Sequence, residues 1–371
     1  MGHRQETVAI IGGGLAGIIA AATAAKYGAK VILVTSGAGT LGMSGGSVNL
    51  QGLDLKRPYL AEAMNFFTEM MVVAGCEYKG NLRELQLIPN AMGSFQEMSL
   101  APTFVSAGSP VNGSKVMVVG IHGLSGFNPD LTAELLTASA NKRDFQVKYT
   151  GTMIEVPWLK KRTFNTLDLA NYLEKQENRD KLAEITKPLV KNCSLLLLPA
   201  ILGQQIGSKE FTAFEEKVGC TVVELNTVPP SIIGLRIFQC LQKYLQKVGV
   251  DIRSGYPVQS LQLQAGRCTA VTLDTPGRKN VIKADNFIVA TGRINTFHIA
   301  ITEGGKDTDV LLKEDATINE HMQLLNENQI PIAANVYGAG SILKSYSCKN
   351  GNSLAILTGY QAGMIAMGVK K

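Results

Sequence analysis

Two short apolar runs near the start of the chain flank a segment rich in alanine. Val8–Ile11 and Val31–Val34 contain only apolar residues, which is typical of parallel strands buried on both faces. Leu15–Tyr27 between them predicts a helix, and Gly28 is the kind of residue at which a helix ends. The pattern therefore predicts a strand–helix–strand unit at the N-terminus.

Similar runs recur along the chain between segments of helical or alternating periodicity. Strands are expected at 116–120, 145–156, 194–199, 221–225, 286–290 and 336–340, and an antiparallel meander at 258–264, 269–273 and 280–283. Helices are expected at 61–74, 129–141, 167–176, 179–190, 235–248 and 352–367. Strand–turn elements of the nucleotide-binding kind thus occur at both ends of the chain.

This arrangement predicts an α/β fold with two domains. Residues 1–150 and 284–371 are expected to form a discontinuous nucleotide-binding domain with a Rossmann-like, doubly wound parallel sheet. Residues 151–283 are expected to form an inserted α+β domain that serves a substrate or a partner.

Length, composition and charge narrow the class of protein. The 371 residues allow two domains, and 45% hydrophobic with 18% charged residues is ordinary for a globular protein. The net charge of +6 comes from scattered lysines and arginines, so we expect a solvated surface that modestly favours small anionic substrates or acidic partners and binds no nucleic acid. The six cysteines include no C-x-x-C pair, which argues against a metal or iron–sulfur site in this chain and fits a reducing cytoplasm.

No secretory or membrane-spanning segment is expected. Polar residues at 1–7 lead directly into the first strand. The longest apolar stretches, at 15–25, 195–203 and 354–369, are too short or too interrupted to cross a bilayer. The sequence favours a cytoplasmic protein and leaves open a peripheral attachment to the inner face of the membrane through partners.

A G-x-G-x-x-G pattern links the first strand to the first helix. Gly12 permits a tight turn, Gly14 lets the backbone approach a phosphate, and Gly17 lets the helix pack on the strand. The helix start offers free N–H groups and partial positive charge to an anion. The candidate cofactor-binding residues here are Gly12, Gly14, Leu15, Ala16 and Gly17.

The second strand ends in Thr35-Ser36, where a dinucleotide-binding fold usually has Asp or Glu for the ribose. Two interpretations stay open. Either these hydroxyl groups bind a ribose weakly, or the ligand is a mononucleotide such as FMN.

Three further segments are typical of flavoproteins with a dinucleotide-binding fold. Ala290-Thr291-Gly292 ends a buried strand, and 338–340 with the C-terminal helix is similar to the last flavin-binding element of that class. In such an element, the N-terminus of the helix stabilises negative charge on the reduced flavin ring. The loop Ser44–Ser47 offers small residues and hydroxyl groups. Plain packing or a surface turn remains the alternative for each.

The cofactor is therefore predicted to be FAD or FMN. The further candidate residues are Thr35, Ser36, Ser44, Gly45, Gly46, Ser47, Ala290, Thr291, Gly292, Gly338, Gly340, Ser341, Ser353 and Leu354.

Two arginines are candidates for binding an anionic substrate. Arg293 directly follows the Ala-Thr-Gly turn, whereas for Arg236 a surface salt bridge is the stronger interpretation. His122 follows the strand at 116–120 and is a weak candidate for catalysis. No residue is assigned as catalytic, no histidine pairs with a carboxylate at a metal-ligand spacing, and hydrolase motifs are absent.

The ordered series of motifs resembles the family of B-type subunits of the anaerobic glycerol-3-phosphate dehydrogenase. The matching segments are 8–17, 31–35, 43–50, 118–126, 192–203, 228–236, 288–292 and 337–343. The resemblance implies a flavoprotein subunit, usually assigned FMN, next to a catalytic flavoprotein subunit and an iron–sulfur subunit. It also implies that glycerol 3-phosphate is oxidised to dihydroxyacetone phosphate and that electrons pass toward a quinone pool or an anaerobic acceptor.

The chain departs from this family at Arg293–His298, which replaces a Ser-Gly-Gly-Leu turn, and at Lys344–Cys348, which replaces a more Gly-rich segment. Two alternatives to the enzyme subunit therefore stay open. One is a non-catalytic or electron-relay subunit that keeps the fold, and the other is a stand-alone flavin dehydrogenase of another small hydroxy compound.

Overall fold

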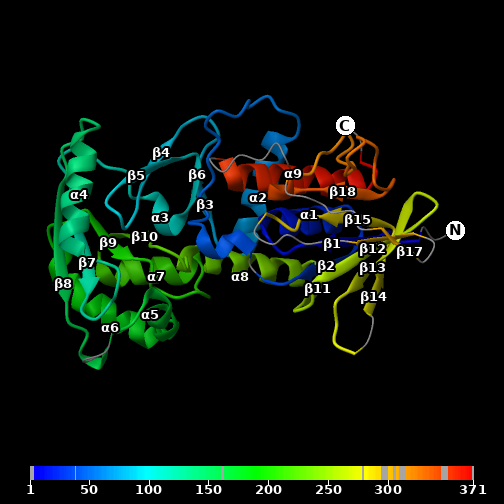
Figure 1. Ribbon diagram of the computed structural model, residues 1–371. Helices are drawn as coiled ribbons and strands as arrows, with labels where there is room; N and C mark the ends of the chain where they lie inside the picture. Colours follow the sequence, from blue (N-terminus) through cyan, green and yellow to red (C-terminus); the bar gives the residue numbers. More distant parts are fainter. Residues whose placement is uncertain are drawn as a thin grey trace. The chain divides into compact units, whose positions relative to one another are not determined.

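The chain folds into two compact units (Figure 1). The computed structural model describes residues 4–37, 39–159, 163–277, 280–293, 300–303, 306–308, 315–343 and 350–369. Unit 1 comprises residues 1–40, 52–69 and 241–371, and unit 2 comprises residues 41–51 and 70–240.

The apolar runs from both ends of the chain form one five-stranded sheet in unit 1. Its order is β11 (Asp251–Ser254), β2 (Lys30–Thr35), β1 (Thr7–Ile11), β15 (Asn286–Val289) and β18 (Val336–Gly338). All neighbouring strands are parallel. Ile10 lies in register with Leu33 and Ile288, and all three are buried, as expected for a sheet covered on both faces. The prediction of a Rossmann-like α/β fold is confirmed.

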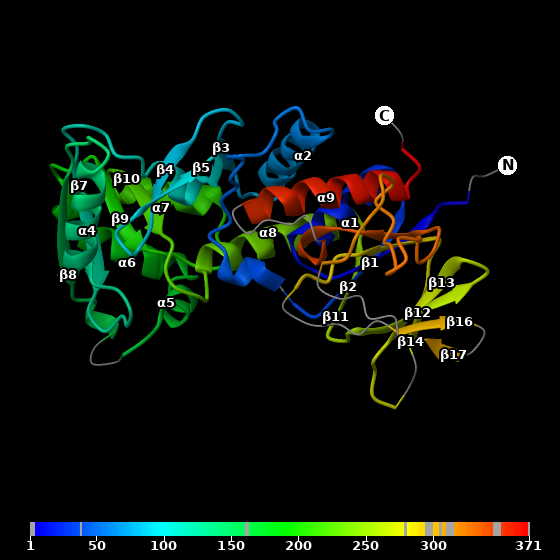
Figure 2. The ribbon, with the colours of Figure 1, turned by 45° about the horizontal axis from the view of Figure 1, so that its top comes forward.

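Helices α1 (Leu15–Lys26) and α9 (Gly351–Ala366) lie side by side in both ribbon views (Figures 1 and 2). Glycine allows this close approach. A Cβ atom at Gly359 would lie 2.4 Å from the carbonyl oxygen of Ala16, and one at Gly363 would lie 2.7 Å from Cβ of Thr23. The first and last helices of the chain therefore pack as one layer.

Unit 1 also contains the predicted antiparallel meander. It consists of β12 (Val258–Gln264), β13 (Arg267–Leu273) and β14 (Asn280–Lys283), and β16 (Ala300–Glu303) and β17 (Lys306–Thr308) extend it. β12 and β13 are antiparallel, as are β13 and β14, whereas β16 runs parallel to β12.

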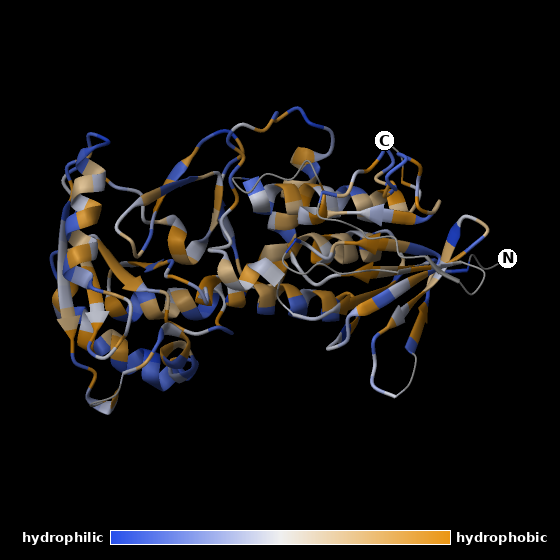
Figure 3. Cartoon of the chain, in the orientation of Figure 1, coloured by the Kyte–Doolittle hydropathy of each residue, from blue (hydrophilic) through white to orange (hydrophobic). Residues whose placement is uncertain are grey.

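Unit 2 is built around a second parallel sheet. Its order is β10 (Thr221–Leu225), β9 (Leu195–Pro199), β7 (Lys115–Ile121) and β8 (Lys148–Ile154). β9 is buried throughout and is hydrophobic in Figure 3. Two short antiparallel pairs accompany the sheet, namely β3 (Tyr78–Gly80) with β6 (Leu100–Pro102) and β4 (Gln86–Pro89) with β5 (Phe95–Met98).

The remaining helices are α2 (Leu60–Val73), α3 (Thr103–Ser106), α4 (Pro129–Asn141), α5 (Thr166–Tyr172), α6 (Gln176–Thr186), α7 (Ser208–Val218) and α8 (Ile232–Lys247). The start of α4 follows from its sequence, because the Asn128 side chain accepts a hydrogen bond from the Leu131 N–H and Pro129 occupies the first turn.

The two units do not coincide with the two expected domains. Residues 41–51 and 70–150, expected in the nucleotide-binding domain, belong to unit 2, and residues 241–283, expected in the insert, belong to unit 1. The cause is strand pairing, because β7 pairs with β8 and β9, whereas β11 joins the sheet of β1.

Candidate flavin site

The glycine-rich turn between β1 and α1 is tightly packed against its own unit. Gly12 has φ of 116° and donates a hydrogen bond from its N–H to the Val34 carbonyl oxygen at 2.8 Å. A Cβ atom at Gly12 would lie 2.3 Å from the Ala290 carbonyl oxygen, and one at Gly17 would lie 1.9 Å from the Gly12 carbonyl oxygen. Gly12 and Gly17 are therefore required by the fold itself.

Gly14 differs from both of these glycines. It is the N-cap of α1 with φ of −72°, and a Cβ atom there would meet no atom of the described residues within 4 Å. The first bond of α1 runs from the Ile18 N–H to the Gly14 carbonyl oxygen, so the three preceding N–H groups of the helix have no acceptor within it. The first turn carries no acidic residue. Open space, free donors and the helix dipole fit a flavin phosphate at this position.

Three sequence-distant segments meet at the carboxyl edge of the unit 1 sheet. Ala290 follows β15 and lies against Gly12, as its carbonyl contact shows. Gly340 follows β18, and a Cβ atom there would lie 2.7 Å from Cβ of Ala16. A Cβ atom at Gly292 would lie 3.5 Å from Oγ of Ser341. This is the edge at which open α/β sheets bind their ligands.

The hydroxyl group of Thr35 forms hydrogen bonds with the backbone of Gly37. Thr35 is 4% exposed, and its Oγ1 donates to the Gly37 carbonyl oxygen at 2.9 Å and accepts from the Gly37 N–H at 3.0 Å. A Cβ atom at Gly13 would lie 2.0 Å from the same oxygen. Thr35 thus supports the turn, and of the two residues expected to bind a ribose only Ser36 is exposed.

Other candidate residues in unit 1 have packing roles. The Ser353 hydroxyl group donates to the Asn350 carbonyl oxygen, and both Ser353 and Leu354 are buried at the start of α9. A Cβ atom at Gly338 would lie 2.7 Å from the Leu324 side chain. Thr358 was missed from the sequence, although its Oγ1 accepts a hydrogen bond from the Gly340 N–H at 2.9 Å.

The Ser44–Ser47 loop belongs to unit 2, so its expected contact with a flavin stays a prediction. Within that unit, a Cβ atom at Gly45 would lie 2.7 Å from Nδ2 of Asn226, and one at Gly46 would lie 2.0 Å from the Ile237 side chain. Tyr78 donates to the Gly46 carbonyl oxygen at 2.9 Å. Burial, reinforced by nearby thiols, raises the pKa of Tyr78, so this donor stays protonated.

Arg293 lies directly after the Gly292 turn of unit 1. Its Nη2 donates to a carboxylate oxygen of Asp315 at 2.8 Å and to the Leu343 carbonyl oxygen at 3.4 Å. Its Nε is buried without a hydrogen-bond partner among the described residues. The Arg293 side chain is 31% exposed, so the charge of its guanidinium is accessible to an anion. The departures expected at 294–298 and 344–348 lie outside the described residues.

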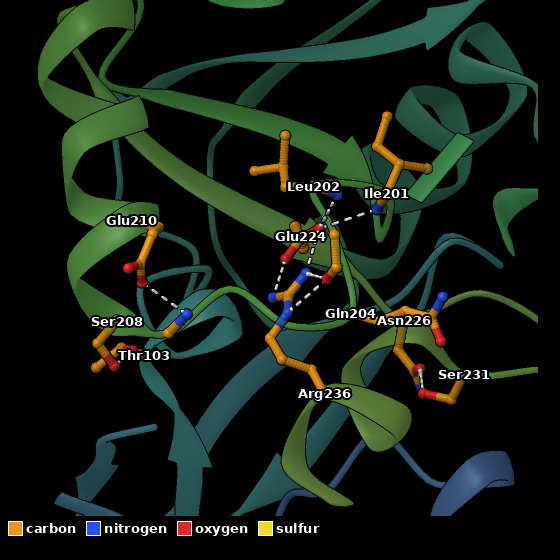
Figure 4. Close-up of polar contacts among 12 residues, drawn as sticks. Thr103, Ile201, Leu202, Gln204, Ser208, Glu210, Glu224, Asn226, Ser231 and Arg236 are labelled. Carbon is orange, nitrogen blue, oxygen red and sulfur yellow. Dashed lines mark hydrogen bonds and ion pairs between the residues drawn. The ribbon is translucent and has the colours of Figure 1, made fainter. Parts of the chain in front are cut away.

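Arg236 has a different place from the one expected (Figure 4). It is 0% exposed and forms a buried ion pair with Glu224, with Nη1 and Oε2 2.5 Å apart. Its Nε and Nη2 donate to the Gly203 carbonyl oxygen at 2.9 and 2.6 Å, and its guanidinium lies 4.4 Å from the centre of the Phe104 ring. Both predictions for Arg236, a substrate-binding residue and a surface salt bridge, are therefore wrong, because its side chain is buried.

Glu224 is in turn fixed by the backbone at the end of β9. It accepts hydrogen bonds from the Ile201 and Leu202 N–H groups at 2.9 and 2.8 Å (Figure 4).

His122 is exposed at the end of β7 and carries no feature that assigns it to catalysis. The described residues hold no cluster of three or more potential metal ligands, and none of their helices is long and apolar enough to cross a membrane.

The parallel sheet and the glycine-rich turn are those of a nucleotide-binding fold. The model of the family described as "FAD binding domain" matches residues 7–58, 59–241 and 234–345, and the chain belongs to this family. It is accordingly a flavin-dependent oxidoreductase with a flavin cofactor.

The chain is also similar to curated dehydrogenase subunits. It is 27% identical to the B-type subunit of the anaerobic glycerol-3-phosphate dehydrogenase of Yersinia pestis, over 82% of this chain and 80% of that protein. It is 24% identical to the probable B-type subunit of the same dehydrogenase in Halobacterium salinarum, over 98% of both. The resemblance predicted from the motifs is confirmed. A 3-ketosteroid-Δ4-(5α)-dehydrogenase from Rhodococcus jostii RHA1 aligns over 100% of this chain and 98% of its own, with a TM-score of 0.41 and 11% identity.

Proposed function

We propose that this chain is the flavin-bearing B-type subunit of an anaerobic glycerol-3-phosphate dehydrogenase complex. The observation that carries the proposal is the meeting of Gly12, Ala290 and Gly340 around the open start of α1. The names of the similar proteins supply the substrate and the subunit role.

The reaction removes two electrons and two protons from the secondary alcohol of glycerol 3-phosphate and leaves the ketone of dihydroxyacetone phosphate. A bound flavin supplies the capacity to accept a hydride and to release electrons singly. The hydroxyl proton leaves to solvent. The electrons continue to a quinone or another anaerobic acceptor through partner subunits.

In this proposal, residues of the chain bind the flavin and orient the substrate. The N–H groups at the start of α1 hold a flavin phosphate, and the absence of acidic residues in that turn avoids repulsion. Arg293 contributes the positive charge of its guanidinium to the substrate anion, while Asp315 and the Leu343 carbonyl oxygen hold that group in place.

The partners in this proposal are a catalytic flavoprotein subunit and an iron–sulfur subunit, together in a hetero-oligomer. The absence of a C-x-x-C pair in this chain fits an iron–sulfur centre carried by another subunit. Attachment to the inner face of the membrane would then run through those partners.

The test has two parts. The cofactor of the purified protein is released by heat and identified by mass, which decides between FAD and FMN. Turnover of glycerol 3-phosphate is then measured with an artificial electron acceptor, for the isolated chain and for the chain with its partners. A colourless protein that takes up neither flavin on titration would refute the proposal.

A chain whose own flavin is reduced by glycerol 3-phosphate only when the catalytic partner is present would identify an electron-relay subunit. Turnover by the isolated chain with a different hydroxy compound, and none with glycerol 3-phosphate, would instead identify a stand-alone dehydrogenase.

A further inference from the structure

A cavity in unit 2 lies at the amino edge of the parallel sheet. Its volume is about 340 Å³, within the size range of small-molecule sites. Its walls come from the first residues of β7 and β8, a short 3₁₀ turn at Lys187–Val190, and the loop that leads into β9. Open α/β sheets bind their ligands at the carboxyl edge, so this cavity has no role in the proposed function.

Three lysines line this cavity, namely Lys115, Lys148 and Lys191. Lys115 and Lys148 are register partners on adjacent parallel strands, so their side chains leave the same face of the sheet about 5 Å apart at the backbone. Like charges at such positions repel each other. All three lysines are solvent-exposed, so water screens this repulsion, and an anion bound among them would face three positive charges.

The chain itself supplies no such anion among its described residues. The cavity lining contains no Asp or Glu, and none of the ion pairs between described residues includes any of the three lysines. Thr150 and Asn192 add neutral hydrogen-bonding groups to the lining. Met117 and Leu189 add apolar surface. The lining therefore combines positive charge, neutral polar groups and an apolar wall.

We propose that this cavity binds a small phosphate-bearing molecule, whose phosphoryl group contacts the three lysines and whose carbon skeleton lies against the apolar wall. Ammonium groups are established ligands of phosphate, and a phosphoryl group carries the charge that the cavity lacks. Inorganic phosphate and organic phosphates share this chemistry, and the experiment distinguishes them.

Cys193 provides a local reporter because this residue lines the same cavity and is partly exposed. The flavin-loaded full chain is treated with iodoacetamide at mildly alkaline pH, and alkylation of Cys193 is followed by peptide mass spectrometry. The probes are inorganic phosphate, pyrophosphate and glucose 6-phosphate, with acetate as the anion control. This readout does not depend on turnover, so its failure is distinguishable from failure of the proposed function.

We expect the phosphate probes to slow Cys193 alkylation at least about fivefold at saturation, with glucose 6-phosphate acting at lower concentration than inorganic phosphate. The double variant Lys148→Gln/Lys191→Gln should weaken the apparent affinity by roughly tenfold or more, because it removes two charge-assisted contacts. The matched control, Lys142→Gln/Lys175→Gln, changes two exposed lysines of the same unit outside the cavity and should leave protection intact.

Three results would overturn the proposal. They are no protection by any phosphate probe, equal protection by acetate, and equal loss in both double variants. Protection by inorganic phosphate but not by glucose 6-phosphate would also overturn it, because the cavity would then bind the free anion and no organic phosphate.

Discussion

Gly14 offers a direct test of the flavin site because the fold does not require glycine there. Within the part of the chain that the structure describes, a Cβ atom at this position would meet nothing within 4 Å, and φ of −72° is accessible to any residue. Gly14→Val and Gly14→Ser therefore place a side chain where the phosphate is expected without a clash inside the chain. Serine is also a preferred N-cap residue, so Gly14→Ser should hold or raise the stability of α1.

The expected loss follows from the N–H groups at the start of α1. Hydrogen bonds to a charged group contribute about 1.5–3 kcal/mol each. If the new side chain excludes the phosphate from two of them, flavin binding weakens by about 3–6 kcal/mol, which is roughly a 10²- to 10⁴-fold rise in Kd. The assay is flavin titration of the apoprotein, with the free energy of unfolding measured in parallel.

Gly28→Ala is the matched control at the other end of the same helix. Gly28 has φ of 89° and open space around its Cβ position, so alanine there is strained by about 1 kcal/mol and touches no ligand. We expect Gly28→Ala to lower stability and retain flavin, and Gly14→Ser to retain stability and lose flavin. If Gly14→Ser binds flavin as tightly as the unaltered chain, the phosphate is not at the start of α1.

Three other perturbations test separate parts of the molecule. Glu224→Gln leaves the buried guanidinium of Arg236 without its counter-charge, so it should lower the free energy of unfolding, measured by urea titration, by about 3–5 kcal/mol. The control Glu216→Gln changes an exposed carboxylate and should alter the free energy of unfolding by less than about 0.5 kcal/mol. Equal effects of the two variants would contradict the structural role of the Arg236–Glu224 pair. Burial raises the pKa of Cys268 to about 12, against about 8.5 in an unfolded chain, so the folded state holds this proton more tightly. The contribution of Cys268 to the free energy of unfolding should therefore be fully present below about pH 8.5 and should fall by up to about 1.4 kcal/mol per pH unit above it. Cys268→Ser should flatten this dependence on pH, and an unchanged slope would show that Cys268 is not its source. Arg293→Ala should raise KM for the anionic substrate roughly tenfold or more at unchanged flavin content, with partial recovery in Arg293→Lys, and an unchanged KM would exclude it from the substrate site.

Local pattern was sufficient for most elements of the chain. The helix expected at 129–141 is α4, since Asn128, Pro129 and the apolar periodicity all act within one or two turns. β1, β2, β9 and β10 follow from runs of apolar residues in the same way. Signals of this kind are complete within a few residues, so no knowledge of the tertiary structure is needed to read them.

Pairing between distant segments was not predictable from the same pattern. The run at 116–120 is as apolar as Val8–Ile11, yet β7 belongs to another sheet. The apolar sequence of a buried parallel strand does not specify which strands pair with it. β11 was missed because Asp251–Ser254 is an edge strand of mixed polarity. The burial of Arg236 likewise depends on Glu224 and Gly203, which contact it only in the folded chain.

The three glycines of the G-x-G-x-x-G turn separate the demands of the fold from those of a ligand. Gly12 and Gly17 would be needed in a strand–turn–helix that bound nothing, because side chains there would overlap the Ala290 and Gly12 carbonyl oxygens. Gly14 meets no such constraint, and Ser, Thr, Asp or Asn would cap α1 at least as well. A subunit that kept this fold but had lost its flavin would have no packing reason to keep glycine at that position. The residue at position 14 therefore favours a chain that holds its own flavin over a scaffold without one.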